Sequence, residues 1–169
     1  MTVADLTTLF DYSYWANARI FRAVAHLTEE AFARPLNDGH GSIRDTLVHT
    51  LSAERGWLGR CGGPERGPSL RGEDFVNVAA LTAAWGETET QVRRFLASLT
   101  DGDLERMAEY NDSRGERRAM PLGELLHHTA IHAVHHRGQV ATMLRLLEHP
   151  AEPIDILFYY AEQRGVTAW

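Results

Sequence analysis

The segment from Pro121 to about Glu148 is the feature that most constrains the fold. Successive residues of an α-helix are separated by about 100° around the axis, and the apolar residues of this segment fall on one side. Proline suits the first position of a helix, where its missing N–H costs no hydrogen bond. The segment therefore predicts a long helix that buries one face. That face consists of Leu122, Leu125, Leu126, Thr129, Ala133, Val140, Met143, Leu144 and Leu147.

Three more segments carry the same helical period and are separated by stretches rich in turn-forming residues. They run from about Val3 to Leu27, from an N-cap at Ser42 to about Cys61, and from about Asn77 to Leu99. A shorter helix is expected over Ile154–Gln163. Long helices joined by short connections favour an all-α protein built as a bundle of four main helices.

A short hairpin or irregular insertion is expected before the last long helix. Residues 104–120 show no helical period, and the stretch Asn111–Gly115 is typical of a tight turn. This turn would join a strand over Met107–Tyr110 to a second strand over Arg117–Met120.

Composition limits the classes of function. The 169 residues fit one domain, residues 1–169, with a sizeable core, and the net charge of −6 argues against binding nucleic acid. No apolar run approaches the roughly 20 residues of a membrane span, and the N-terminus lacks the pattern of a signal peptide. Because Cys61 is the only cysteine, no intramolecular disulfide can form, and we expect a cytoplasmic protein without a membrane partner.

Five of the nine histidines lie within residues 127–136. On the helical wheel, His132 and His136 fall inside the apolar stripe, His127 and His135 fall outside it, and His128 lies at its edge. A spacing of four residues brings two Cβ atoms to about 6 Å, which suits two nitrogens bound to one metal ion. A metal ion also removes the cost of burying an unpaired imidazole. Two alternatives stay open, namely core histidines bonded to polar groups and a rival pair of His128 with His132.

A third ligand must come from another part of the chain. His49 lies within the second long helix but outside its apolar stripe, so helical spacing alone counts against it. Small residues beside it leave room for an ion and a substrate. His40 lies in a loop between two glycines. Spacing does not choose among the remaining histidines, which are His26, His40, His49 and His149.

Several motifs resemble one protein family. The tract His132–Gln139 resembles the H-x-x-x-H-R-G-Q signature of the DinB/YfiT-like superfamily of metalloenzymes, which is distinct from the lesion-bypass polymerase that shares the name DinB. Three further stretches, Tyr12–Asn17, Ser42–Leu58 and Asp155–Gln163, are similar to other parts of the family pattern. Together the motifs span nearly the whole chain in the right order.

The resemblance implies an antiparallel four-helix bundle, a homodimer, and a metal ion bound by three histidines. Carried over residue by residue, these ligands are His49, His132 and His136. Imidazole ligands suit Zn²⁺ or Ni²⁺, and three of them leave a position open for water or for a low-molecular-weight thiol cosubstrate. We expect a metal-dependent enzyme acting on a small molecule, with thiol-dependent S-transfer or related detoxification chemistry ahead of hydrolysis. A non-catalytic metal-binding stress-response protein is the alternative.

The sequence does not identify a general base. Glu54, Tyr12 and Gln139 are candidates, because each can project between helices or toward the ligands. Each also has a structural interpretation, such as a salt bridge or a hydrogen bond that fixes a ligand imidazole. The resemblance assigns no role to His127, His128 or His135.

Overall fold

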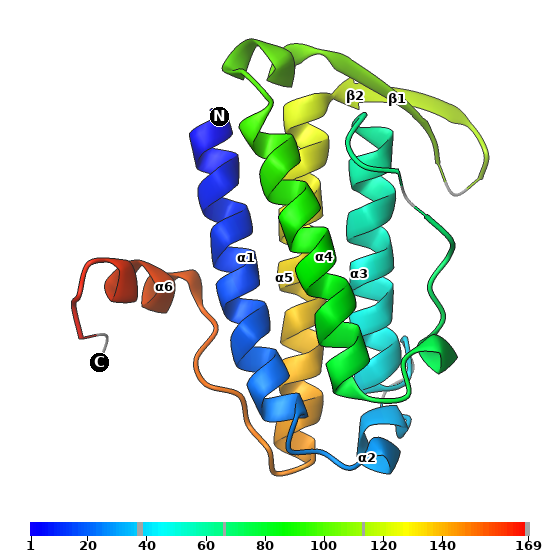
Figure 1. Ribbon diagram of the computed structural model, residues 1–169, viewed down its shortest axis with the longest axis vertical. Helices are drawn as coiled ribbons and strands as arrows, with labels where there is room; N and C mark the ends of the chain where they lie inside the picture. The colour runs from blue at the N-terminus through cyan, green and yellow to red at the C-terminus, as the bar shows by residue number, and fades with distance from the viewer. Residues whose placement is uncertain (37–38, 66, 113, 168–169) are drawn as a thin grey trace.

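The computed structural model describes residues 1–36, 39–65, 67–112 and 114–167 and shows a mostly helical chain with a small two-stranded sheet (Figure 1). Four helices are long and two are short. The elements are α1 (Val3–Val24), α2 (Glu29–Ala33), α3 (Ile43–Arg60), α4 (Val78–Ala97), β1 (Met107–Asn111), β2 (Arg117–Pro121), α5 (Leu122–Leu146) and α6 (Ile156–Gln163). Two 3₁₀ turns, Gly72–Asp74 and Asp101–Glu105, flank α4.

Polar N-cap residues define where the long helices begin. The Ser42 hydroxyl accepts a hydrogen bond from the Asp45 N–H at the start of α3, as the sequence predicts, and the Asn77 side chain accepts one from the Ala80 N–H at the start of α4. Each of these bonds satisfies a backbone donor that has no partner within the helix. Pro121 occupies the N-cap position of α5, so this helix begins at Leu122, one residue after the predicted start.

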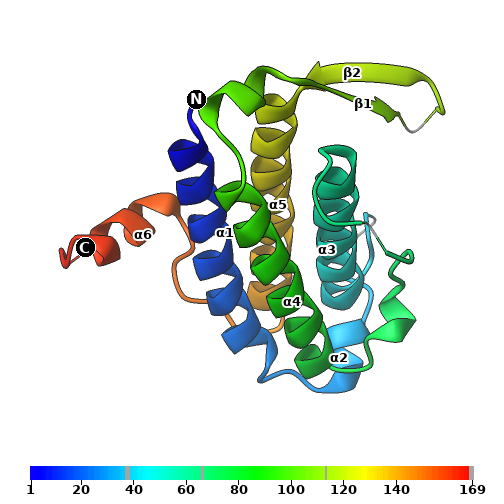
Figure 2. The ribbon, with the colours of Figure 1, turned by 45° about the horizontal axis from the view of Figure 1, so that its top comes forward.

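The four long helices lie side by side, and each packs against two neighbours (Figures 1 and 2). α5 lies between α1 and α3, and α4 closes the arrangement on the other side. α1 and α5 run in one direction and α3 and α4 in the other, so the antiparallel neighbours are α3 with α5 and α1 with α4. α3 and α4 run in the same direction because residues 61–65 and 67–77 lead back along the length of the helices.

The core lies between these helices and follows the predicted apolar stripes. Leu6, Ile20, Leu51, Leu126 and Leu144 are fully buried. Burying a leucine or isoleucine side chain contributes about 1.5–3 kcal/mol each, so the stripes account for the association of the helices. In the described part of the chain, every helix is too short or too polar to traverse a lipid bilayer.

The predicted hairpin is present and covers the end of the molecule where α5 begins (Figure 2). Its strands pair antiparallel, with Met107 opposite Pro121 and Asn111 opposite Arg117. Residue 113, within the predicted turn, lies outside the described residues. From β1 the Tyr110 ring contacts Trp57 of α3 edge-on, with ring centroids 5.3 Å apart. The hairpin therefore joins the ends of α3 and α5.

The two short helices differ from the prediction. The five-residue helix α2 was not expected, because so short a segment carries too few residues to display a period. The last helix begins at Ile156 rather than Ile154, since the Asp155 carboxylate caps it by accepting a hydrogen bond from the Leu157 N–H.

The interior also contains charged and polar side chains. Arg137 of α5 is only 2% exposed and donates hydrogen bonds to the hydroxyl of Ser13 and the side-chain oxygen of Asn17, both on α1. Glu54 of α3 is 3% exposed and accepts a hydrogen bond of 2.8 Å from the Tyr14 hydroxyl. Burial raises the pKa of the Glu54 carboxyl from its ordinary 4.5 to about 7, although the nearby Arg137 charge acts in the opposite direction.

This raised pKa predicts how stability changes with pH. The stabilising contribution of protonated Glu54 is fully present below about pH 4.5 and is lost as the pH rises through about 7, because the unfolded chain releases the proton first. A difference of two to three pH units corresponds to about 3 kcal/mol. Glu54→Gln, which keeps the acceptor for Tyr14, should lack this loss when urea unfolding with a chelator is followed from pH 4.5 to 8. Parallel pH profiles for the two proteins would contradict the prediction.

Candidate metal centre

Histidines from α3 and α5 meet where these helices pack. His49 projects from α3, and His132 and His136 project from α5. The ring centroid of His49 lies 5.4 Å from that of His132 and 4.7 Å from that of His136. The ring centroids of His132 and His136 are 4.4 Å apart. The three side chains expected as ligands therefore lie together, although His49 and His132 are 83 positions apart in the sequence.

The position of His49 explains why helical spacing counts against it. The apolar stripe of α3, with Leu47 and Leu51, faces the common core, whereas His49 is half-buried on the flank that packs against α5. A helix with two packed neighbours has a wider buried face than a single apolar stripe. The signal for His49 therefore lay in the family resemblance and not in the hydrophobic period.

A hydrogen bond fixes the orientation of His136. Its Nδ1 lies 2.8 Å from Oε1 of Gln139, an oxygen that can only accept, so Nδ1 carries the proton. In the neutral ring this leaves Nε2 with a free lone pair. That nitrogen lies 3.1 Å from Nε2 of His132, which therefore donates to it. Gln139 thus presents the His136 lone pair to the centre of the cluster.

His40 is a fourth member of the cluster, and it was not in the predicted ligand set. Its ring stacks on that of His49 with centroids 3.8 Å apart, and it contacts the His136 ring edge-on at 5.2 Å. One nitrogen from each of His40, His49 and His136 lies within 4.8 Å of the other two. The flanking glycines were the only sequence signal for His40, because periodicity gives no information about a loop.

Burial favours the neutral form of the imidazoles of His49, His132 and His136. Burial lowers the pKa of His49 to about 4, with smaller contributions from His40 and His136. Burial also lowers the pKa of His132 to about 4, assisted by neighbouring imidazoles, and it lowers that of His136. Neutral imidazoles keep the lone pairs that metal ions require.

This donor set fits a divalent transition metal. Two nitrogens at about 2.1 Å from one ion are at most about 4.2 Å apart. The nitrogens of His40, His49 and His136 already lie within 4.8 Å of one another, so these three need to move by only a few tenths of an ångström. Imidazole ligands suit zinc, nickel, copper and iron, whereas magnesium and calcium prefer oxygen ligands.

Two other histidines of α5, His128 and His135, lie beside the cluster. His128 is exposed; its ring lies 5.7 Å from that of His132 and 4.9 Å from that of Trp57. His135 is exposed beside His136, and its Nε2 lies 3.4 Å from the Gln139 amide nitrogen. The rings of His128, Trp57 and Tyr110 thus contact one another in turn, from His132 to the hairpin.

The candidate catalytic side chains occupy three different environments. Gln139 contacts His136 directly, as described above. Glu54 lies in the common core, bonded to Tyr14. Tyr12 donates a hydrogen bond to the Ile154 carbonyl and packs against Tyr159 of α6, so it anchors the C-terminal helix. Of the three, Gln139 is the one that the structure places beside the histidines.

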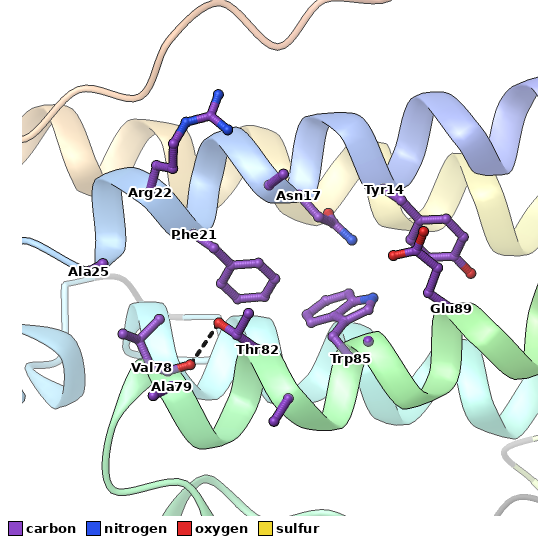
Figure 3. Close-up of a pocket in the computed structure, with 13 residues that line it drawn as sticks. Tyr14, Asn17, Phe21, Arg22, Ala25, Val78, Ala79, Thr82, Trp85 and Glu89 are labelled. Atoms are coloured by element: carbon purple, nitrogen blue, oxygen red, sulfur yellow. Dashed lines mark hydrogen bonds between the residues drawn. The ribbon is translucent and has the colours of Figure 1, made fainter.

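A cavity of about 710 Å³ lies elsewhere, between α1 and α4 (Figure 3). Phe21 and Trp85 project between these two helices, and Tyr14 and Glu89 lie together at one end (Figure 3). Its lining residues, all in the described part of the chain, include no histidine. The cavity and the histidine cluster therefore lie between different pairs of helices.

Comparisons with known proteins agree with this architecture. The chain is 23% identical over 156 residues to the protein DinB of Bacillus subtilis strain 168, covering 89% of this chain and 91% of that protein. The crystal structure of a DinB-like protein from Bacillus cereus ATCC 10987 superposes with a TM-score of 0.69 and 19% identity, covering 90% of this chain and 97% of the other, which shows a shared fold. The model of the DinB family matches residues 1–166. The chain therefore belongs to the DinB family.

Proposed function

We propose that this protein is a single-domain, metal-dependent enzyme that acts on a small molecule. Its four long helices form a four-helix bundle that holds one Zn²⁺ or Ni²⁺ ion on His49, His132 and His136. The observation that carries the proposal is the convergence of three neutral imidazoles from two separate helices, with ring centroids between 4.4 and 5.4 Å apart. We further propose a cytoplasmic homodimer, in line with the family resemblance.

The surrounding residues have defined roles in this proposal. A divalent ion held by neutral imidazoles keeps its full charge and supplies Lewis-acid activation of a bound thiol or water. Gln139 holds the proton of His136 on Nδ1, so that the Nε2 lone pair would be available to an ion. An ion on both Nε2 atoms would replace the hydrogen bond between His132 and His136, and His132 would then carry its proton on Nδ1.

The chemistry that we place first is S-transfer from a low-molecular-weight thiol to an electrophile. The cluster lies where α3 packs against α5, at a partly exposed position, since His132 is half-buried and His128 beside it is exposed. A cosubstrate can therefore approach from solvent. Trp57, half-buried, contacts His128 edge-on and offers an aromatic surface next to the centre. Hydrolysis and a non-catalytic metal-binding role are the alternative outcomes of the tests below.

The ligand set predicts how metal content depends on single histidines. Protein purified without an affinity tag should contain about one divalent ion per chain, and His132→Ala or His49→Ala should lose much of it, because each substitution removes one of the imidazoles that the packed helices hold in place. His127→Ala is the matched control, since His127 is an exposed histidine of the same helix. Elemental analysis measures the difference. Equal metal content in the wild type and in His132→Ala would contradict the assignment.

The hydrogen bond from His136 predicts a positioning role for Gln139. Gln139→Leu removes the acceptor and should weaken metal binding about tenfold, whereas Gln139→Glu keeps an acceptor and should retain the affinity. Competition with a chromophoric chelator gives the affinities, and far-UV circular dichroism checks the fold. Gln91→Leu, at an exposed position of α4, serves as the control. An affinity unchanged in Gln139→Leu would rule out this role.

Turnover distinguishes the three functions. Metal-loaded protein, incubated with a low-molecular-weight thiol and a panel of electrophiles, should form thioether products, and His132→Ala should form them at the uncatalysed rate. Hydrolysis of an ester panel without thiol would instead favour the hydrolase. If the metal-loaded protein accelerates neither reaction, the non-catalytic role is the remaining function. Thiol transfer that persists after removal of the metal would refute the proposed mechanism.

A further inference from the structure

His40 differs from the other members of the cluster because it does not belong to a helix. It lies between the end of α2 at Ala33 and the start of α3 at Ile43. Its side chain is exposed, whereas His136 is buried and His49 is half-buried. Its ring nevertheless lies against the cluster, 3.8 Å from the His49 ring and 5.2 Å from the His136 ring.

The backbone next to His40 depends on a glycine. Gly41 has φ of +85°, a conformation that L side chains rarely adopt, and a Cβ at this position would meet no atom within 4 Å. Glycine is therefore required by the backbone conformation and not by a lack of space. The Gly41 carbonyl accepts a hydrogen bond from the Leu36 N–H, and the His40 carbonyl accepts one from the Ser42 N–H. This local geometry directs His40 toward the helices.

We infer that His40 is a fourth, displaceable ligand that closes the metal centre in the resting protein. The inference rests on the proposed function, because it assumes an ion on the histidines of α3 and α5. One His40 nitrogen lies within 4.8 Å of a nitrogen of His49 and of His136, close enough to share an ion with both.

The ligands are attached to the fold in different ways, and this difference determines which of them can leave the ion. His49, His132 and His136 are fixed by two packed helices, whereas His40 is attached through a short segment and is exposed. Four protein ligands make a closed site, and three leave a position for an exogenous ligand. An incoming ligand then donates one lone pair in place of the His40 lone pair. His40 therefore lowers the affinity for every ligand that must enter this position.

The size of this effect follows from a simple equilibrium. If His40 is bound nine-tenths of the time, only about one-tenth of the centres accept an exogenous ligand, and its apparent Kd rises about tenfold. A ring that only stacks on His49 would produce no such competition. The affinity for a small exogenous ligand therefore separates the two roles of His40.

The test uses the full chain loaded with Co²⁺, whose visible absorption reports ligand exchange, and azide as the probe. His40→Ala should bind azide about tenfold more tightly than the wild type, bind Co²⁺ more weakly, and shift the visible bands. His127→Ala removes an exposed histidine of α5 and should match the wild type in all three measurements. Because His40 is exposed, the substitution leaves the packed helices intact, which circular dichroism verifies.

A second pair of variants keeps every histidine. Gly41→Ala disfavours the positive φ and should loosen His40, so azide affinity should rise about fivefold. Gly115→Ala is the matched control, because Gly115 also has a positive φ, +81°, with no atom within 4 Å of a Cβ, but lies beside the hairpin turn. Equal azide affinity in these two variants would overturn the role given to Gly41.

The outcomes distinguish this inference from the proposed function. Azide and Co²⁺ affinities that are the same in His40→Ala and the wild type would overturn the inference and leave the three-histidine centre intact. A wild-type protein that binds no Co²⁺ would overturn both. Tighter azide binding in His40→Ala alone, with His127→Ala unchanged, is the result that establishes His40 as the displaceable ligand.

Discussion

The antiparallel packing of α3 against α5 is the interaction on which the candidate centre depends. It brings the middle of α3 beside the middle of α5, so that His49 meets His132 and His136 across one helix contact. The apolar stripes of both helices hold this contact by burying residues such as Leu51 and Leu126 in the common core. The histidines lie on the flank of the contact. Stability and chemistry therefore use adjacent faces of the same two helices.

Burial controls the charge of these side chains. The same helix contact that positions the imidazoles partly removes them from water, which lowers the pKa of His49 and His132 to about 4. In the common core, burial has the opposite effect on a carboxyl and raises the pKa of Glu54. Near neutral pH the imidazoles of His49 and His132 are therefore uncharged. Arg137 and Glu54 illustrate a separate use of burial, since they join α5 to α1 and α3 to α1 through hydrogen bonds.

The features predicted from the sequence are those that follow from periodicity and local chemistry. The long helices, the Ser42 cap and the hairpin strands were predicted because each depends on neighbouring residues. The pairing of His132 with His136 follows from their spacing on one helix. His49 required the family resemblance, since its position depends on which helix packs beside α3. The proximity of His40 was not predictable, because it depends on the φ of Gly41 and on a loop path that no period encodes.

The separation of the histidines along the chain has a thermodynamic consequence. His49 precedes α4 and the hairpin, and His132 follows them, so an ion shared by these residues would act as a non-covalent cross-link around nearly half of the chain. An ion bound only by the native state stabilises that state by mass action, and its ligands meet only after folding has closed this long loop. Metal supply would then affect the stability of the folded protein as well as the occupancy of its centre.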